Sequence, residues 1–350
     1  MPIEDTNSLG EFDLIHKYFS RHVISNESTL DSKRTDTPII LSIGDDCALL
    51  APPQPNHVLA ITTDMLVQGR HFFASTDPKK LGHKCLAVNL SDLAAIGAKP
   101  IAFTLSLALP SIDEQWLKAF SEGLFSLADQ HNCKLIGGDT TKGPLTVSIT
   151  AFGEVPQNQA LKRSNASIND DIWVSNNLGD ARLALGHTLN EWQLNPTMFE
   201  RVAQHMDAPN PQNTLGIALR DVAHSAIDIS DGLLGDLRHI LKASKLDAQI
   251  FIDEIPCSFD LLEMPEDIRR ICTLKGGDDY EICFTASPIN RPLIKDLAQK
   301  LHIKLTRIGK TQPPENTGGH ISLIDQHHSV LTHTDAAKYF QSFDHFKEPI

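Results

Sequence analysis

The sequence predicts an α+β protein of two domains. Its 350 residues are long for a single hydrophobic core and suit two domains of ordinary size. Both halves mix strand-like and helical segments without a regular βαβ period, which favours α+β over a doubly wound sheet. Residues 156–171 (PQNQALKRSNASINDD) are polar, with few large apolar side chains. We therefore expect the domain junction there and domains at residues 1–155 and 156–350.

The first half starts with a helical pattern at residues 10–19, where apolar residues recur at helical spacing. A helical stretch opened by Pro78 runs through Ala98, and residues 112–132 form an amphipathic helical pattern. The strands expected in this half are residues 57–64, 101–109, 134–138 and 144–155.

The second half opens at residues 172–176 and continues through helical segments to residues 225–232. Strands follow at residues 248–253, 281–285 and 321–325. We find no low-complexity tract and no repeat of fixed period, so a solenoid is not expected.

Composition and charge exclude several classes of protein. Lys and Arg total 31 against 44 Asp and Glu, a formal net charge of −13, which argues against a nucleic-acid surface. The N-terminus has no basic start followed by an apolar run, and the longest apolar stretch, residues 101–109, is too short for a bilayer span. The six cysteines form no C-x-x-C pair, so we expect reduced thiols rather than zinc or disulfides. These features indicate a cytoplasmic protein without a membrane partner.

Five short motifs place aspartates beside glycine or at strand ends. They are GDDCALL (44–50), ITTD (61–64), NLSDLAAIGA (89–98), IGGDTT (136–141) and DISDG (228–232). Mg²⁺ prefers hard oxygen ligands and often bridges a carboxylate to a phosphate. Isolated aspartates beside hydroxyl groups, delivered from several loops, suit that role.

Each motif also has a purely structural interpretation. Asp92 shares one helical stripe with apolar residues, and a buried carboxylate needs either a metal or a partner such as a cation or a backbone group. The alternatives elsewhere are a turn at Asp45 and Asp46, a helix cap at Ser230 or Asp231, a bulge at Gly137 and Gly138, and ordinary strand positions at Thr62 and Thr63. The sequence has no EF-hand loop, P-loop or Rossmann fingerprint. Nucleotide phosphates would therefore need metal bridges and a few Arg or Lys.

In order and wording, the motifs resemble the thiamine-monophosphate kinase family of the aminoimidazole ribonucleotide synthetase superfamily. The similarity runs from GEFDLI through IGDDCALL, TTDMLVQGRHF, NLSDLAAIGA, IGGDTTKGPL, AIDISDGL and GGDDYEICF to a weaker SFDHF at Phe343. It thus covers nearly the whole chain, and so many ordered matches by chance are very improbable.

The resemblance implies a two-domain α+β fold of the aminoimidazole ribonucleotide synthetase type. Its N-terminal domain, residues 1–155, would bind ATP and Mg²⁺ and contribute to a β-barrel at the interface of a homodimer. The C-terminal α/β domain, residues 156–350, would contribute to nucleotide and substrate binding. The substrates implied are ATP, as co-substrate, and thiamine monophosphate.

The resemblance also assigns site residues by position. The metal positions, for several Mg²⁺ ions, are Asp46, Thr62, Thr63, Asp64, Asp92, Asp139, Asp228 and Asp231. The ATP positions are Gly138, Asp139, Arg163 and Ser230. The substrate positions are His71, Asp278 and Phe340.

Two positions depart from the family pattern. Asp278 stands where the family has glutamate. Its side chain is one methylene shorter, so a contact with the substrate through a water molecule is an alternative to a direct one. Near the C-terminus the family has a tryptophan, and the aligned residue here is Phe340, which keeps a ring for stacking but has no indole N–H. Because the local alignment is loose, Tyr339 is an alternative to Phe340.

The expected mechanism follows from the phosphate group of thiamine monophosphate, which would accept the γ-phosphate of ATP. A phosphate monoester with a second pKa near ~6 is largely dianionic at neutral pH, so no general base and no covalent residue are required. We expect direct in-line transfer, with Mg²⁺ and Arg163 offsetting the charge of the two anions. Two alternatives stay open. One is another ATP-dependent enzyme of the superfamily, of the ligase or selenophosphate synthetase type. The other is a non-catalytic nucleotide- or metal-binding relative.

Overall fold

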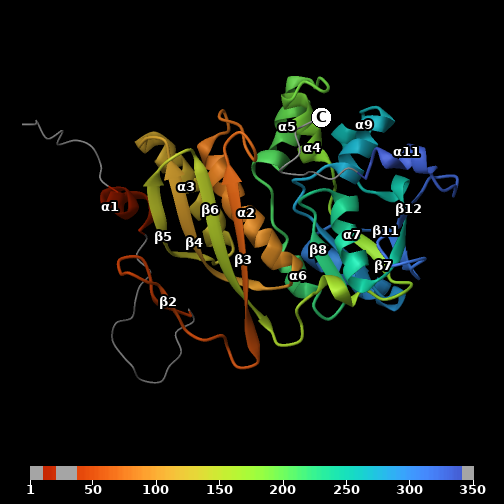
Figure 1. Cartoon of the computed structure of the whole chain (residues 1–350), viewed down its shortest axis with the longest axis horizontal. Coiled ribbons are helices and arrows are strands. Elements are labelled where there is room, and N and C mark those ends of the chain that lie inside the picture. Colours follow the sequence, from red (N-terminus) through yellow and green to blue (C-terminus); the bar gives the residue numbers. More distant parts are fainter. Residues whose placement is uncertain (1–10, 21–37, 341–350) are drawn as a thin grey trace, which may run out of the picture. The chain divides into compact units, whose positions relative to one another are not determined.

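The structure, a computed structural model, describes residues 11–20 and 38–340 (Figure 1). Contacts divide the described chain into two compact units. Unit 1 holds the described residues up to Asn89 together with Pro100–Glu154, and unit 2 holds Leu90–Lys99 together with the described residues from Val155 onward. The motif at Phe343 lies outside the described residues.

Unit 1 is built on a four-stranded sheet with the strand order β3-β6-β4-β5. Its strands are β3 (His57–Val67), β4 (Lys99–Leu109), β5 (Lys134–Lys142) and β6 (Thr146–Pro156). Burial alternates residue by residue along β6, as expected for a sheet with only one covered face. A separate hairpin pairs β1 (Ile39–Leu41) with β2 (Leu49–Leu50).

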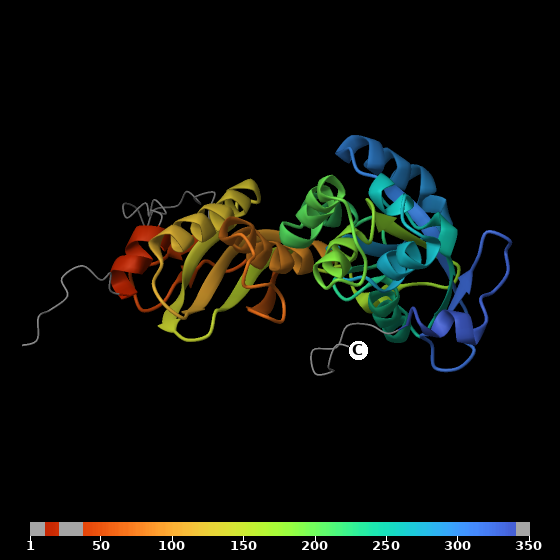
Figure 2. The same ribbon diagram turned by 90° about the horizontal axis from the view of Figure 1, so that it is seen from above.

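Two helices, α2 (Pro78–Ala95) and α3 (Glu114–Gln130), lie against one face of this sheet (Figure 2). The backbones of α2 and α3 approach each other closely at two glycines. A Cβ at Gly82 would meet Phe120 O at 2.0 Å, and one at Gly123 would meet Lys79 O at 1.8 Å. Asp113 caps α3 by accepting hydrogen bonds from Gln115 N and Trp116 N. A short helix, α1 (Glu11–Leu14), continues into a π-helical turn at Ile15–Phe19.

Unit 2 is built on a six-stranded sheet with the strand order β12-β9-β11-β7-β10-β8. Its strands are β7 (Asp171–Ser175), β8 (Ser225–Asp228), β9 (Asp247–Phe251), β10 (Ile282–Ala286), β11 (Leu305–Gln312) and β12 (Ile321–Ile324). The pairs are antiparallel except for β12 with β9. This mixture of helices with mainly antiparallel strands is the α+β class that the sequence predicts.

Both faces of the central strands in unit 2 are buried. Along β10, Cys283 belongs to a core cluster with Leu233 and Leu237 of α7, whereas Ile282 and Phe284 belong to the cluster that includes Ile294 of α10. This period-2 alternation explains why all five residues of β10 are buried. The helices of unit 2 are α4 (Asp180–Thr188), α5 (Pro196–Asp207), α6 (Asn213–Ala218), α7 (Leu233–Ser244), α8 (Phe259–Leu262), α9 (Glu266–Arg270), α10 (Arg291–Leu301) and α11 (His333–Ala337).

The predicted helix through Ala98 ends three residues earlier, at Ala95, where the chain turns through Gly97 with a positive φ of 72°. All six cysteines are free, and four of them are buried. Within the described ranges, no helix has the length and apolar character needed to cross a bilayer.

Candidate active site

The loop after β8 in unit 2 carries three of the predicted ATP and metal positions. Asp228, at the end of β8, is only 4% exposed and pairs with Ile282 of β10. Ser91 of α2 donates a hydrogen bond from Oγ to Asp228 Oδ2 at 2.8 Å. A buried carboxylate with a hydroxyl donor is thereby fixed in orientation.

Asp236 in the first turn of α7 organises the rest of this loop. Its Oδ2 accepts hydrogen bonds from Ser230 N and Asp231 N, both at 3.0 Å. Neither Ser230 nor Asp231, considered as caps of α7, occupies its N-cap position. The N-cap position of α7 is taken by Gly232, which has a φ of 110° and no side chain.

Negative charge is concentrated around Asp236. Burial raises the pKa of Asp236 well above its ordinary value, and the nearby carboxylates of Asp228 and Asp231 raise it further. The hydrogen bonds that the Asp236 carboxylate accepts from two backbone N–H groups lower its pKa and only partly offset this rise. A divalent cation beside Asp228 and Asp231 would relieve this repulsion.

The predicted stripe on α2 is not a distinct face, because residues 84–91 of this helix are buried on all sides. Asp92 follows this run and is half-buried, while its neighbour Ser91 is fully buried. Both residues belong to unit 2.

The GGDDYE segment lies beside the same loop in unit 2. Asp278 N donates to Ser230 O and Tyr280 N donates to Ile229 O, both at 2.8 Å. Asp278 and Tyr280 have positive φ angles of 65° and 50°, a conformation that non-glycine residues seldom adopt. Tyr280 Oη donates to Asp278 Oδ1 at 3.0 Å, so the Asp278 side chain has a defined direction.

Arg163 and Phe340 are also in unit 2. Arg163 begins an exposed 3₁₀ turn, Arg163–Asn165, ahead of β7. Phe340 is half-buried against the core, with the Arg238 guanidinium 5.0 Å from its ring centroid. Tyr339, the alternative to Phe340, is only 2% exposed.

In unit 1, Gly138 and Asp139 lie on β5, opposite Leu105 and Ser106 of the parallel strand β4. The register shifts just before Gly137, which fits the bulge considered for these glycines. Gly138 has a φ of 148°, and a Cβ there would meet Leu105 O at 1.8 Å. Only glycine lets the strand that carries Asp139 approach β4 this closely.

Replacing Gly138 with alanine should therefore destabilise unit 1 by about 2 kcal/mol or more, through backbone strain and the clash with Leu105. Urea unfolding followed by the fluorescence of Trp116, in a Trp173→Phe/Trp192→Phe background, measures this change. Gly137→Ala is the matched control, because a Cβ at Gly137 has nothing within 4 Å. Equal stability of the two variants would contradict the close-approach argument.

The three predicted positions on β3 do not share a face. Thr62 and Asp64 alternate with Thr63, which is exposed with its neighbours Ile61 and Met65. Thr63 Oγ1 donates to Ile149 O of β6 at 3.1 Å. The side chains of Thr62 and Asp64 therefore point away from that of Thr63.

The remaining unit 1 positions are in turns. His71 follows β3, and its Nδ1 accepts a hydrogen bond from Val67 N at 3.0 Å. This acceptor role places the proton of the neutral ring on Nε2. Asp46 is exposed in the turn between β1 and β2, where its N–H donates to Asp45 Oδ1 at 2.8 Å, as expected of a turn.

The predicted positions are thus divided between the units. Unit 1 holds Asp46, Thr62, Thr63, Asp64, His71, Gly138 and Asp139, and unit 2 holds Asp92, Arg163, Asp228, Ser230, Asp231, Asp278 and Phe340. Among the residues that the structure describes, no group of three or more His, Cys, Asp or Glu is arranged to hold a metal ion.

Sequence reasoning did not identify Ser91 or Asp236, which orient the loop at residues 228–232. A local signal existed for Asp236, since an acidic residue in the first turn of a helix is a common partner for free N–H groups. Ser91 gave no such signal, because its partner Asp228 is 137 positions away in the chain.

Comparison with known proteins gives consistent matches. Residues 44–155 match the family described as AIR synthase related protein, N-terminal domain. A thiamine-monophosphate kinase of Salmonella typhimurium is 44% identical over 303 residues, 86% of this chain and 90% of that protein. The crystal structure of thiamine-monophosphate kinase from Stenotrophomonas maltophilia K279a is 46% identical, with a TM-score of 0.76 over 81% of this chain and 91% of that chain.

A further solved structure, AaThiL complexed with AMPPCP and TMP, is 26% identical, with a TM-score of 0.68 over 78% of this chain and 86% of that chain. Identities of this size over most of both chains establish common ancestry. The chain belongs to the thiamine-monophosphate kinase family.

Proposed function

We propose that this enzyme transfers the γ-phosphate of ATP to thiamine monophosphate and releases thiamine diphosphate and ADP. The observation that carries the proposal is the 44% identity to a thiamine-monophosphate kinase over 86% of the chain. The AaThiL complex supports it, because AMPPCP is an ATP analogue and was bound together with TMP. The ligase, selenophosphate synthetase and non-catalytic alternatives have no comparable support.

The donor chemistry of the predicted positions fits Mg²⁺. Carboxylate and hydroxyl oxygens are its preferred protein ligands, and a magnesium ion that bridges to substrate phosphates needs only one or two carboxylates. In unit 2, Asp228 and Asp231 would hold such an ion. Asp92 is the third proposed ligand there, and it directly follows Ser91, whose hydroxyl orients Asp228. In unit 1, Asp46, Thr62, Asp64 and Asp139 are the proposed side-chain ligands, and Thr63, whose side chain points to the opposite face of β3, would take part only through its backbone carbonyl. When bound, Mg²⁺ would neutralise phosphate charge and polarise the transferred phosphoryl group.

The protein's own groups would bind and orient the two anions. An oxygen of the acceptor phosphate, already dianionic, forms the new bond to the γ-phosphorus as the bond to the ADP oxygen breaks. Arg163 would contact the ATP phosphates through its guanidinium, and backbone at Gly138 and side-chain oxygens at Ser230 would complete the nucleotide contacts. His71, Asp278 and Phe340 would contact thiamine monophosphate. No side chain is needed as a covalent carrier.

A homodimer is part of the proposal, with residues 1–155 supplying the interface and residues 156–350 contributing to nucleotide and substrate binding. Large apolar side chains on β1 to β3 support it, among them Ile40 (59% exposed), Ile61 (60%) and Met65 (58%). Monomers in sedimentation equilibrium would contradict this proposal. The six free thiols and the use of ATP agree with a cytoplasmic location.

A product assay tests the function. Purified enzyme with ATP, thiamine monophosphate and Mg²⁺ should form thiamine diphosphate and ADP in equal amounts, measured by chromatography. EDTA should abolish product formation, and added Mg²⁺ should restore it. Formation of ADP without thiamine diphosphate would contradict the assignment of thiamine monophosphate as the acceptor. Nucleotide binding without either product would support the non-catalytic alternative.

A further inference from the structure

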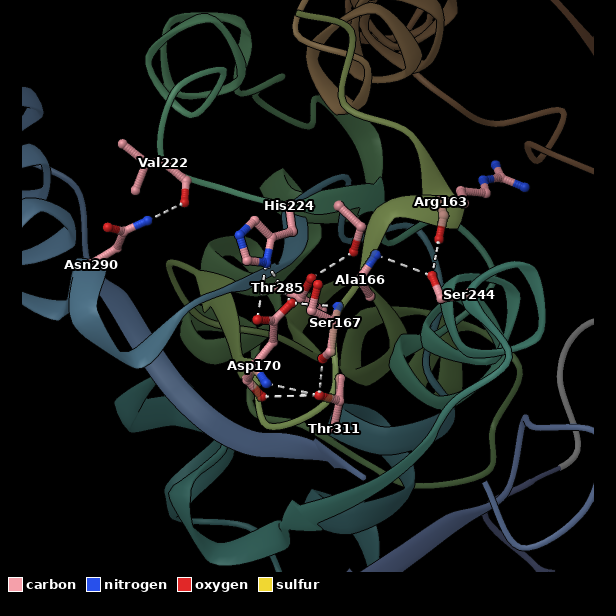
Figure 3. A network of polar contacts seen from close by, with 11 residues as sticks. Arg163, Ala166, Ser167, Asp170, Val222, His224, Ser244, Thr285, Asn290 and Thr311 are labelled. Atoms are coloured by element: carbon pink, nitrogen blue, oxygen red, sulfur yellow. Dashed lines mark hydrogen bonds and ion pairs between the residues drawn. The ribbon is translucent and has the colours of Figure 1, made fainter. Parts of the chain in front are cut away.

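One serine hydroxyl holds both sides of the turn that carries Arg163. Ser244 Oγ, at the end of α7, donates to Arg163 O at 2.8 Å and accepts from Ala166 N at 3.2 Å (Figure 3). The bond within the turn, from Asn165 N to Lys162 O, is long at 3.4 Å. The side chains of the turn are exposed, and the chain leading into it is held at buried Leu161, whose N–H donates to Ile96 O at 3.1 Å, so Ser244 anchors the turn itself.

The other end of this segment is fixed separately. Asp170 is 2% exposed and accepts hydrogen bonds from Ser167 N at 2.8 Å and from the His224 ring at 2.8 Å. Thr311 Oγ1 accepts from Asp170 N at 2.9 Å and donates to Ser167 O at 2.6 Å (Figure 3). Residues 167–170 are therefore anchored to the core by bonds that do not involve Ser244, whereas Arg163 O and Ala166 N both bond to its hydroxyl.

Helix α7 connects the Arg163 turn to the carboxylate loop of unit 2. Its first turn holds the loop through Asp236, and its last residue holds the turn through Ser244, about 12 Å further along the helix axis. Leu237 and Ile240, between these points, are fully buried, so the helix is a rigid spacer. Burial lowers the pKa of His239 on this helix, and the positive charge of Arg163 lowers it further.

We propose that Ser244 is a positioning residue for Arg163. By holding the backbone of the Arg163 turn to the end of α7, it sets the distance between the guanidinium and the loop at residues 228–232. This inference rests on the proposed role of Arg163 in binding the phosphates of ATP. The Arg163 side chain extends away from the hydrogen-bonded network, so Ser244 acts through the backbone alone (Figure 3).

Ser244→Ala tests the proposal, with affinity for magnesium-loaded AMPPCP measured by calorimetry as a readout that does not depend on turnover. Loss of the two hydrogen bonds should weaken AMPPCP binding and raise the KM for ATP by about 5-fold, while the KM for thiamine monophosphate stays unchanged. Ser244→Thr keeps the hydroxyl and should restore affinity. Ser121→Ala is the matched control, because Ser121 Oγ likewise donates to a backbone carbonyl, Lys118 O at 3.0 Å, in unit 1.

A double-mutant cycle separates positioning from a general loss of stability. In an Arg163→Ala background, Ser244→Ala should cause no further loss of AMPPCP affinity, because no guanidinium is left to position. Wild-type affinity in Ser244→Ala, or the same loss with and without Arg163, would overturn the proposal. If the enzyme bound AMPPCP in this pattern but made no thiamine diphosphate, the proposed reaction would fail and the positioning role would stand.

Discussion

Asp231→Asn is expected to lower kcat by about 100-fold or more while the protein stays folded. Asparagine has nearly the same shape but lacks the negative charge that a magnesium ligand supplies. This part of the loop is fixed by a hydrogen bond from the backbone N–H of Asp231 to Asp236 Oδ2. The substitution changes only the side chain of residue 231, so this hydrogen bond stays in place. The Asp231 side chain is exposed, which keeps the cost to stability small.

Steady-state kinetics with ATP and thiamine monophosphate measure this effect, and urea unfolding checks the fold. Asp296→Asn is the control, since Asp296 is an exposed aspartate on α10 of the same unit. We expect near wild-type kcat for this control. Full activity in Asp231→Asn would remove Asp231 from the proposed metal ligands.

The second large effect concerns the pH dependence of stability and comes from Glu281. Burial raises the pKa of its carboxyl group to about 7, although Ser175, Asn176 and Gln212 donate hydrogen bonds to it. Because the folded protein holds this proton more tightly than the unfolded chain, the stability from this group is full below about pH 4.5. It is lost as the pH rises to about 7.

Glu281→Gln removes this titration. The difference in unfolding free energy between wild type and variant should fall by about 3 kcal/mol between pH 4.5 and 7 and stay constant above that range. The raised pKa of buried Asp236 is the same in both proteins and cancels in the difference, whereas the Glu281 carboxylate itself helps to raise the pKa of Asp279, so the substitution also alters the titration of Asp279.

Urea unfolding in a Trp116→Phe background gives this free energy for unit 2, because the two remaining tryptophans, Trp173 and Trp192, lie there. Glu122→Gln, at an exposed position on α3, is the control and should show no such change with pH. A pH-independent difference for Glu281→Gln between pH 4.5 and 7 would show that folding does not raise the pKa of this carboxyl group.

Local patterns were enough to predict much of the fold. The period-2 alternation of β6 and the apolar face of α3 are properties of short segments, and both elements form close to where their patterns predict them. Asp228 at the end of β8 also follows from its motif, because a polar residue after a buried strand marks a loop at the sheet edge.

The orientation of side chains in the site depends on distant contacts that no local pattern records. Ser91 orients Asp228 across 137 positions, and Ser244 holds Arg163 across 81. The burial of Tyr339 is likewise a consequence of the unit 2 core, which the local sequence at residues 339–340 does not reveal. Because side chains alternate along β3, the side chain of Thr63 lies on the opposite face from those of Thr62 and Asp64. The sequence motif alone did not show that these three side chains are separated.

The fate of the γ-phosphorus is the most direct test of the proposed reaction. With [γ-³²P]ATP, Mg²⁺ and thiamine monophosphate, the label should appear in thiamine diphosphate, one label for each ADP formed, and Asp231→Asn should transfer it at least about 100-fold more slowly. Label released as inorganic phosphate without labelled thiamine diphosphate would contradict direct transfer between the two phosphates.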